Sequence, residues 1–264
     1  MKPDSSSVAD GAAQHNTASM SFTTGIPETL VAVHKGIVAC DRCTRLREYC
    51  CTVAHVKKRA HRNETYWARP VPGFGDPAAR LLLVALAPAA HGANRTGRAF
   101  TGDGPGGSGD FLMSALHRTG YANIPTSQHL QDGLRLDDAY ITSAVRCAPP
   151  GNKPLPEESA RCLDHLEAEV AQLPHVRVVV ALGKIAFDAW LRLLRRRGVS
   201  VTPRPQFAHG AVVDLGSDVP LLMGCYHPSR QNTNTGKLTA EMMVEIFRKA
   251  SRLSRDSRGR GFRR

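Results

Sequence analysis

Four strand-length apolar runs, separated by longer amphipathic stretches, constrain the fold of this chain more than any other feature. The runs are LLLVALAP (81–88), YITSAV (140–145), VRVVVALG (176–183) and VPLLMGCYHPS (219–229). Three of them are almost continuously apolar, as parallel strands with two covered faces are. Helical patterns lie between and after them, at residues 110–118, 156–172, 184–197 and 239–253. This alternation predicts a three-layer α/β sandwich, in which helices cover both faces of a four-stranded, mainly parallel sheet.

The two ends of the chain differ in composition from the part between them. Residues 1–25 are rich in Ser, Ala, Gly and Thr without an apolar period, which predicts a disordered tail. Residues 254–264 are rich in arginine, which is typical of a solvated arm that binds phosphates non-specifically. We therefore expect one domain from residue 26 to residue 253, large enough to bury an adequate core.

The charge of the chain favours a polyanionic partner. Lys and Arg total 35 against 23 acidic residues, which gives a net charge of +12 and a pI of about 9.8. Nucleic acid is the first candidate, although a merely basic protein remains an alternative on charge alone.

No apolar stretch approaches the ~20 residues that cross a bilayer, because the best, residues 81–90, is short and contains Pro88. The N-terminus lacks the apolar segment of a secretory signal, so we expect no membrane association and a reducing, cytoplasmic compartment, near the nucleoid in a prokaryote.

Seven cysteines in a reducing compartment are explained by metal binding, catalysis or burial rather than by disulfides. Cys40 and Cys43 form a CxxC, and Cys147 and Cys162 are separated by 162 − 147 − 1 = 14 residues. Four thiolates suit either a tetrahedral zinc ion or an iron-sulphur cluster, and the spacing leaves both open. The other three are interpreted as ordinary cysteines; they are Cys50, Cys51 and Cys225.

Three polar loops follow strands of the predicted sheet: ALAPAAHGANRTGRAFTGD (85–103), RCAPPGNKP (146–154) and HPSRQNTNTGKLT (227–239). The carboxyl ends of parallel strands meet at one edge, where open α/β sheets bind their ligands. We therefore expect these loops to build one site.

Together with the order of the four cysteines, these loops resemble those of the type b, fifth-family uracil-DNA glycosylases, with the fourth family as the nearest relative. The resemblance covers the chain from about Cys40 to Leu253. It implies a monofunctional enzyme that hydrolyses the N-glycosidic bond of uracil in single- and double-stranded DNA. It also implies a [4Fe-4S] cluster, held by Cys40, Cys43, Cys147 and Cys162. We expect a monomer.

The resemblance assigns the catalytic roles to four side chains. A glycosylase rotates its nucleotide out of the helix, and Phe100 corresponds to the residue that stacks on the extruded base. His227 is expected to donate a hydrogen bond to the departing base, while Asp103 and Asn152 position water or balance charge on the sugar. The alternatives are a core aromatic for Phe100, a surface or core histidine for His227, and helix-capping or turn roles for Asp103 and Asn152.

Three further residues are expected to line the base pocket: His91, Asn94 and Ser143. Ser143 replaces the asparagine with which fourth-family enzymes read uracil, which predicts looser selection that admits hypoxanthine and xanthine. Leu86 stands where those enzymes have an acidic residue, so the acid must come from elsewhere, and Asp103 is the candidate.

The loop after His227 is expected to enter the minor groove of DNA through Arg230, Gln231, Asn232 and Asn234. A flexible surface loop is the alternative. No lysine lies in a motif typical of a Schiff-base nucleophile, so we expect base excision without strand cleavage.

Two other classes of function compete with the glycosylase. A non-catalytic DNA-binding protein with a zinc site would also explain the charge and the CxxC. A ferredoxin-like electron carrier is disfavoured, because the cysteines are too dispersed for the compact two-cluster pattern.

Overall fold

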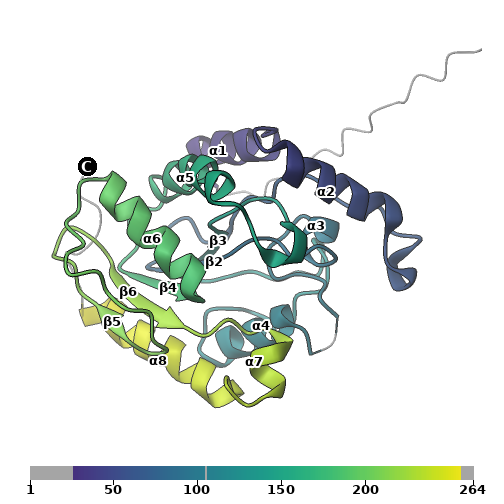
Figure 1. The fold of residues 1–264 in the computed structure, drawn as a ribbon. Coiled ribbons are helices and arrows are strands. Elements are labelled where there is room, and N and C mark those ends of the chain that lie inside the picture. Colours follow the sequence, from purple (N-terminus) through teal and green to yellow (C-terminus); the bar gives the residue numbers. More distant parts are fainter. Residues whose placement is uncertain (1–25, 105, 257–264) are drawn as a thin grey trace, which may run out of the picture.

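The computed structural model describes residues 26–104 and 106–256, and its centre is a six-stranded sheet (Figure 1). The four central strands, in spatial order, are β3 (Ala139–Ser143), β2 (Leu81–Ala85), β4 (Val178–Leu182) and β6 (Leu221–Cys225). All neighbours among them are parallel. They coincide with the four apolar runs, so the predicted α/β class is confirmed.

The predicted number of strands was too low, because the sheet has an antiparallel strand at each edge. These are β1 (Phe74–Gly75), which pairs with β3, and β5 (Val212–Val213), which pairs with β6. Each contains two residues, and so short a segment has no period that a sequence pattern can show.

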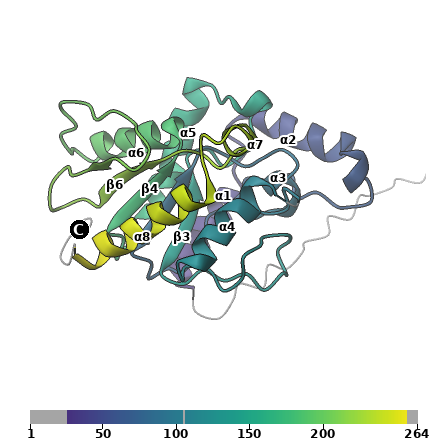
Figure 2. The same cartoon turned by 90° about the horizontal axis from the view of Figure 1, so that it is seen from below.

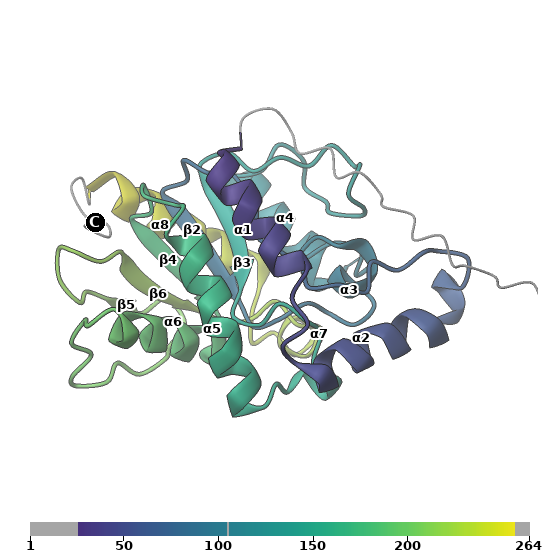
Figure 3. The same cartoon turned by 90° about the horizontal axis from the view of Figure 1, so that it is seen from above.

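Helices cover both faces of the sheet. One face carries α4 (Ser108–Arg118) and α8 (Ala240–Asp256), as Figure 2 shows. The other carries α1 (Glu28–Val38), α5 (Pro156–Val170) and α6 (Lys184–Arg196), as Figure 3 shows. Along β2, Leu81 and Leu83 pack in the first core and Leu82 and Val84 in the second. This alternation confirms the three layers.

Four helices match the predicted ranges, whereas the other helical segments were not predicted. The additional ones are α1, α2 (Thr44–Val56), α3 (Ala93–Thr96), α7 (Arg230–Asn234) and the 3₁₀ turns η1 (Arg59–His61) and η2 (Pro150–Asn152). In α2 only Leu46, Cys50 and Val53 are buried, which is a narrow stripe. The segment 229–239, expected as a loop, begins with the short helix α7.

The predicted N-terminal tail and residues 257–264 lie outside the described residues, while residues 254–256 still belong to α8. Within the described part of the chain, no helix combines the length and apolar character that spanning a membrane requires.

A buried ionic network ties α1 and α5 to the sheet. Glu169 of α5 is fully buried and accepts hydrogen bonds from the backbone of Gly73 at 2.8 Å, from Arg146 at 2.9 Å and from the Thr142 hydroxyl. His34 of α1 lies 3.3 Å from the same carboxylate. Burial alone would raise the pKa of Glu169, but the charge of Arg146 and the hydrogen bonds outweigh it and lower the pKa to about 2. The carboxylate is therefore charged at neutral pH.

Candidate active site

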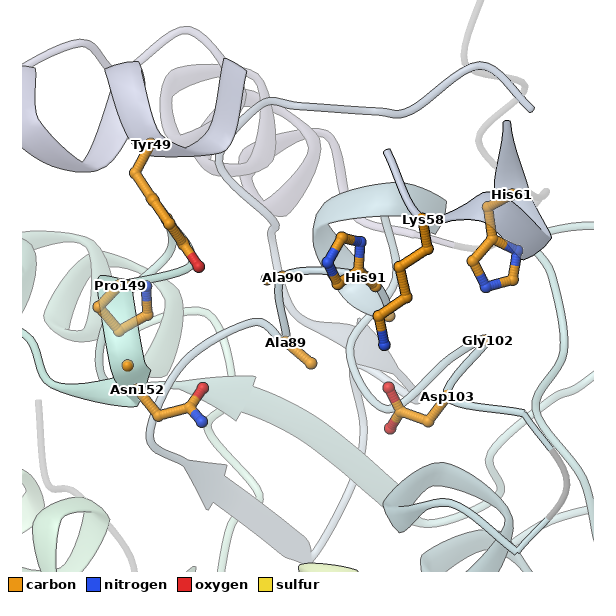
Figure 4. Close-up of a pocket in the computed structure, with 12 residues that line it drawn as sticks. Tyr49, Lys58, His61, Ala89, Ala90, His91, Gly102, Asp103, Pro149 and Asn152 are labelled. Atoms are coloured by element: carbon orange, nitrogen blue, oxygen red, sulfur yellow. The ribbon is translucent and has the colours of Figure 1, made fainter. Parts of the chain in front are cut away.

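Two adjoining cavities lie where the central strands end. The first, of about 340 Å³, takes its walls from all three strand-end loops, and we call it the His227 cavity. Its polar and aromatic lining consists mainly of Phe100, Asp103, Ser143, Asn152, His227 and Arg230. The second, of about 290 Å³, is the Lys58 cavity, and it shares Ala89, Asp103 and Asn152 with the first (Figure 4). The structure thus brings the four proposed catalytic side chains around one space.

The Asp103 carboxylate lies where the two cavities meet. It fits there because its neighbours lack side chains: a Cβ on Gly92 would come within 2.0 Å of the Asp103 Oδ1, and one on Gly107 within 2.6 Å of its Cβ. Burial raises the pKa of Asp103, and the Gly109 backbone N–H and the charge of Arg230 partly offset this. The carboxylate is thus held in a partly desolvated, partly compensated setting, as catalytic carboxylates often are.

Phe100 forms a wall of the His227 cavity and is held in a left-handed backbone conformation, with φ at 52°. This conformation is costly for an aromatic residue and recurs at functional sites. The backbone of Gly109 packs against it so closely that a Cβ there would come within 2.3 Å of the Phe100 carbonyl oxygen. The Phe100 ring is half-buried, and it also contacts the core under α4. Its position is therefore compatible both with stacking on a base and with the alternative role of a core aromatic.

His227 lies two residues beyond the end of β6 and stacks on Phe100, with ring centroids 5.8 Å apart and an angle of 28° between the rings. The side-chain amide of Asn232, in α7, donates a hydrogen bond to the His227 carbonyl at 2.8 Å, and Ser229 caps the start of the same helix. Burial lowers the pKa of His227 to about 4. At neutral pH the imidazole is therefore neutral and can donate one hydrogen bond.

Ser143 and Asn152 complete the cavity from the second strand-end loop. Ser143 is the last residue of β3 and is buried, whereas Asn152 is exposed at the end of η2, with φ at 57°. Asparagine tolerates this conformation better than most residues. Figure 4 shows the Asn152 amide and the Asp103 carboxylate directed into the Lys58 cavity. An amide and a carboxylate can each hydrogen bond to water there.

The two remaining base-pocket candidates do not line the His227 cavity. His91 lines the Lys58 cavity instead, and its Nδ1 is 3.1 Å from the Tyr66 hydroxyl. Asn94 lies outside both cavities and is fully buried, where its amide donates to the Cys50 carbonyl at 3.2 Å and joins the first loop to α2. The sequence placed both residues in the correct loop, but α3 turns the Asn94 side chain inward.

Two arginines of the first loop also have a structural role. Arg95 donates to the Gly102 carbonyl at 2.6 Å and pairs with Glu64. Arg98 donates to Asp132 at 2.6 Å and to the Thr101 hydroxyl at 2.9 Å. Both guanidinium groups are nearly buried, so they fix the loop that carries Phe100 and Asp103.

The four residues proposed to bind DNA lie on or beside α7. Arg230, Gln231 and Asn234 are exposed, and Arg230 also lines the His227 cavity. Asn232 is half-buried and holds the His227 carbonyl. Three of the four side chains are therefore accessible to DNA, while the fourth positions His227.

Comparison with known proteins decides between the remaining interpretations. The model of the uracil DNA glycosylase superfamily matches residues 72–251, which include all three strand-end loops. The chain belongs to the uracil DNA glycosylase superfamily. This membership favours the glycosylase over the zinc-dependent binding protein and over the electron carrier.

Relatives within this superfamily cover most of the chain. It is 52% identical over 219 residues to a type-5 uracil-DNA glycosylase of Mycobacterium tuberculosis, which is 83% of this chain and 79% of that protein. A type-5 uracil-DNA glycosylase of Thermus thermophilus is 52% identical over 218 residues, 83% of this chain and 95% of that protein. A type-4 uracil-DNA glycosylase of Pyrobaculum aerophilum is 31% identical over 169 residues, 64% of this chain and 67% of that protein.

The four cysteines proposed to bind the cluster lie on three segments that pack beside the candidate active site. Cys40 follows α1, Cys43 precedes α2, Cys147 lies in the second loop and Cys162 in α5. Cys43 packs against a small core that contains both Cys147 and Cys162. Cys50, set aside as an ordinary cysteine, belongs to the same core and is fully buried.

Sequence reasoning missed the residues on the far wall of the Lys58 cavity, which include Tyr49, Lys58 and His61. The basic run KKRAH at residues 57–61 was the available signal. It carries no strand or helix pattern, and its approach to the first loop depends on how α2 and η1 are placed.

Proposed function

We propose that this protein removes uracil from DNA by hydrolysing its N-glycosidic bond after the nucleotide has rotated out of the helix. The observation that carries this proposal is the His227 cavity, which gathers Phe100, Asp103, Asn152 and His227 from three loops. The names of the type-5 relatives support the same reaction.

Binding of the flipped base is assigned to Phe100 and Ser143. Extrusion costs a few kcal/mol, and stacking on an aromatic ring returns about 1–3 kcal/mol per base. The Phe100 ring is already stacked with His227, so the base is proposed to displace solvent from the cavity and to contact the part of the ring that His227 leaves uncovered. The Ser143 hydroxyl, at the end of β3, is placed to hydrogen bond the edge of the base.

The chemical step divides its charges between the two sides of the scissile bond. Negative charge develops on the departing base, and the neutral imidazole of His227 donates a hydrogen bond to it. Positive charge develops on the sugar, where the Asp103 carboxylate stabilises it and, together with the Asn152 amide, orients the attacking water. The proton released by that water passes to Asp103 or to solvent.

Ser143 sets the proposed breadth of substrates. A hydroxyl both donates and accepts hydrogen bonds and has no fixed pattern, so the pocket also accepts hypoxanthine and xanthine. The substitution Ser143→Asn is expected to reduce turnover of these two bases more than turnover of uracil.

DNA contact is assigned to the exposed side chains of α7. These side chains are exposed, which supports the proposal that Arg230, Gln231 and Asn234 enter the minor groove beside the flipped nucleotide and fill the space that it leaves. No lysine is among the described residues that line the His227 cavity, so base release is proposed to leave the strand intact.

We further propose that Cys40, Cys43, Cys147 and Cys162 hold a [4Fe-4S] cluster. Four thiolates are a donor set that such a cluster accepts, and three of these cysteines already lie together, because Cys43 packs against the small core that contains Cys147 and Cys162. When bound, the cluster would cross-link the α1–α2 segment to the second loop and α5.

The decisive experiment measures base release from single- and double-stranded oligonucleotides that contain uracil, hypoxanthine, xanthine or ethenocytosine. Wild type, Asp103→Ala and His227→Ala are compared. We expect release of uracil by the wild type without strand cleavage, and losses of about 10²–10³-fold or more in both variants. Absence of uracil release by an iron-replete wild type would refute the proposal.

A further inference from the structure

The Lys58 cavity offers a chemistry that base excision, as described above, does not use. It lies beside the His227 cavity, and its outer wall comes from α2 and from the segment that follows α2. Lys58, His61 and His91 line it, and each of these side chains can carry a positive charge. Burial and the charges of Lys58 and His61 lower the pKa of His91, so His91 is a neutral hydrogen-bonding group beside the Lys58 ammonium.

Two donors in this cavity are free. Within residues 26–104 and 106–256, neither the Lys58 ammonium nor the Tyr49 hydroxyl makes a hydrogen bond or an ion pair. The histidines differ, because His61 pairs with Glu64 at 2.6 Å and His91 contacts Tyr66. Figure 4 shows the Tyr49 hydroxyl and the Lys58 ammonium pointing toward the middle of the cavity.

We infer that the Lys58 cavity binds the backbone phosphate next to the flipped nucleotide. The inference rests on the proposed function, because a base in the His227 cavity places its sugar at Asp103, where the two cavities meet. A phosphate attached to that sugar then lies within reach of the adjoining space. Lys58 and Tyr49 meet it with a charge-assisted and a neutral hydrogen bond, and His61 and His91 add donors around it.

The carboxylate at the junction does not oppose this assignment. Among the described residues that line the Lys58 cavity, Asp103 is the one acidic residue, and three basic side chains line it as well. A phosphate held by these groups also strengthens the proposed step, because it fixes the sugar beside Asp103 and Asn152.

A nucleophilic role for Lys58 is the competing interpretation. A lysine that forms a Schiff base is activated by loss of solvent or by a neighbouring cation, whereas Lys58 is exposed. Phosphate binding needs no such activation, since any accessible ammonium supplies charge and donors.

The first test measures the dissociation constant for a uracil oligonucleotide as a function of salt, using Lys58→Ala, Lys58→Arg and Arg59→Ala. Arg59 is the matched control, because it follows Lys58 directly at the start of η1 and is exposed as Lys58 is, but does not line the cavity. We expect Lys58→Ala to weaken binding about tenfold at low salt and to reduce the slope of log K against log salt by about one unit. Lys58→Arg should retain the slope, and Arg59→Ala should weaken binding less than Lys58→Ala.

The second test replaces single phosphates of the substrate by neutral methylphosphonates, on the 5′ and the 3′ side of the uracil nucleotide in turn. At one of these positions, the methylphosphonate should weaken binding to the wild type. It should not weaken binding to Lys58→Ala any further, because that variant already lacks the contact. Additive losses at both positions would overturn the phosphate site. Borohydride trapping of the protein on abasic DNA that depends on Lys58 would overturn it as well.

These outcomes are separable from failure of the proposed function. If the wild type releases no uracil, the enzyme itself is wrongly assigned. If it releases uracil but Lys58→Ala matches Arg59→Ala in affinity and salt slope, only the phosphate site is wrong.

Discussion

At the scale of single residues, the Asp103 carboxylate is proposed to serve the reaction while its burial lowers the stability of the folded protein. Its pKa is raised because the folded protein removes water from the carboxylate, so ionisation is less favourable in the folded chain than in the unfolded one. As the pH rises through the ordinary range of an aspartate, ionisation of Asp103 therefore lowers the free energy of unfolding.

Asp103→Asn should therefore be less active and more stable than the wild type. We expect kcat to fall by about 10²–10⁴-fold, because the amide neither accepts a proton nor balances positive charge. The melting temperature at pH 7 should rise, as measured by circular dichroism. In the wild type, the acid limb of kcat/KM against pH should lie above the usual aspartate pKa of about 3.9. A variant that is both inactive and less stable would contradict this account.

His227 is expected to act through hydrogen bonding rather than through proton transfer. Its pKa of about 4 keeps the ring neutral from pH 5 upward. His227→Ala should therefore lower kcat by about 10²–10³-fold. This loss should be the same from roughly pH 5.5 to roughly pH 8, because the whole range lies well above the pKa of His227. A loss that grew as the pH approached about 6.5, the ordinary histidine value, would indicate a titrating general acid instead.

At the scale of elements, the start of α4 governs the position of the stacking ring. Gly109 lies in the first turn of α4, and its backbone packs against the Phe100 carbonyl and donates to Asp103. A Cβ at this position meets backbone, which cannot rotate away as a side chain can.

Gly109→Ala should displace the Phe100 loop and lower kcat/KM about tenfold or more, since small misplacements at a reacting centre are costly. Gly36→Ala is the control, because a Cβ at Gly36 meets nothing within 4 Å and the residue is helical. This control should retain full activity and gain up to about 1 kcal/mol in stability. Uracil release and urea unfolding check both variants, and equal activity of the two would contradict the proposed packing.

The same elements show what the sequence could and could not predict. The central strands were predictable because each is buried on both faces. The same pattern predicted the strand-end loops that carry Phe100, Asp103 and His227, whereas the choice of these three residues came from the resemblance, and their roles stay predictions. The two-residue edge strands have no period, and α2 buries only a narrow stripe. Asn94 and Lys58 could not be placed, because the short helix α3 and the segment after α2 decide which way they face.

At the scale of the whole molecule, the buried charge of Glu169 ties α1 and α5 to the sheet. Its contribution to stability is present above its ordinary pKa of 4.5 and is lost as the pH falls toward the folded value of about 2. Glu169→Gln leaves the Arg146 guanidinium, which is 1% exposed, without a charged partner.

Glu169→Gln should reduce the free energy of unfolding at pH 7 by about 3–5 kcal/mol, the usual loss when one partner of a buried pair is removed. Glu241→Gln is the matched control, because Glu241 pairs with Arg118 on the surface and its side chain is 68% exposed. That change should cost at most about 1 kcal/mol. Urea unfolding should show the difference between Glu169→Gln and wild type shrinking as the pH falls from 4.5 toward 2. A difference independent of pH would contradict the ionic network.

The cluster proposed for the four cysteines acts at the same scale, since it would link residues that lie on three separate segments. Cys43→Ser should abolish bound iron and the brown colour, lower the melting temperature and expose the α1–α2 segment to limited proteolysis, because metal binding and local folding are coupled. Cys51→Ser, an exposed change in α2, should keep all three properties. Iron analysis, visible absorption and protease mapping report separately, so loss of iron without any change in stability or cleavage would leave the cluster but refute its structural role.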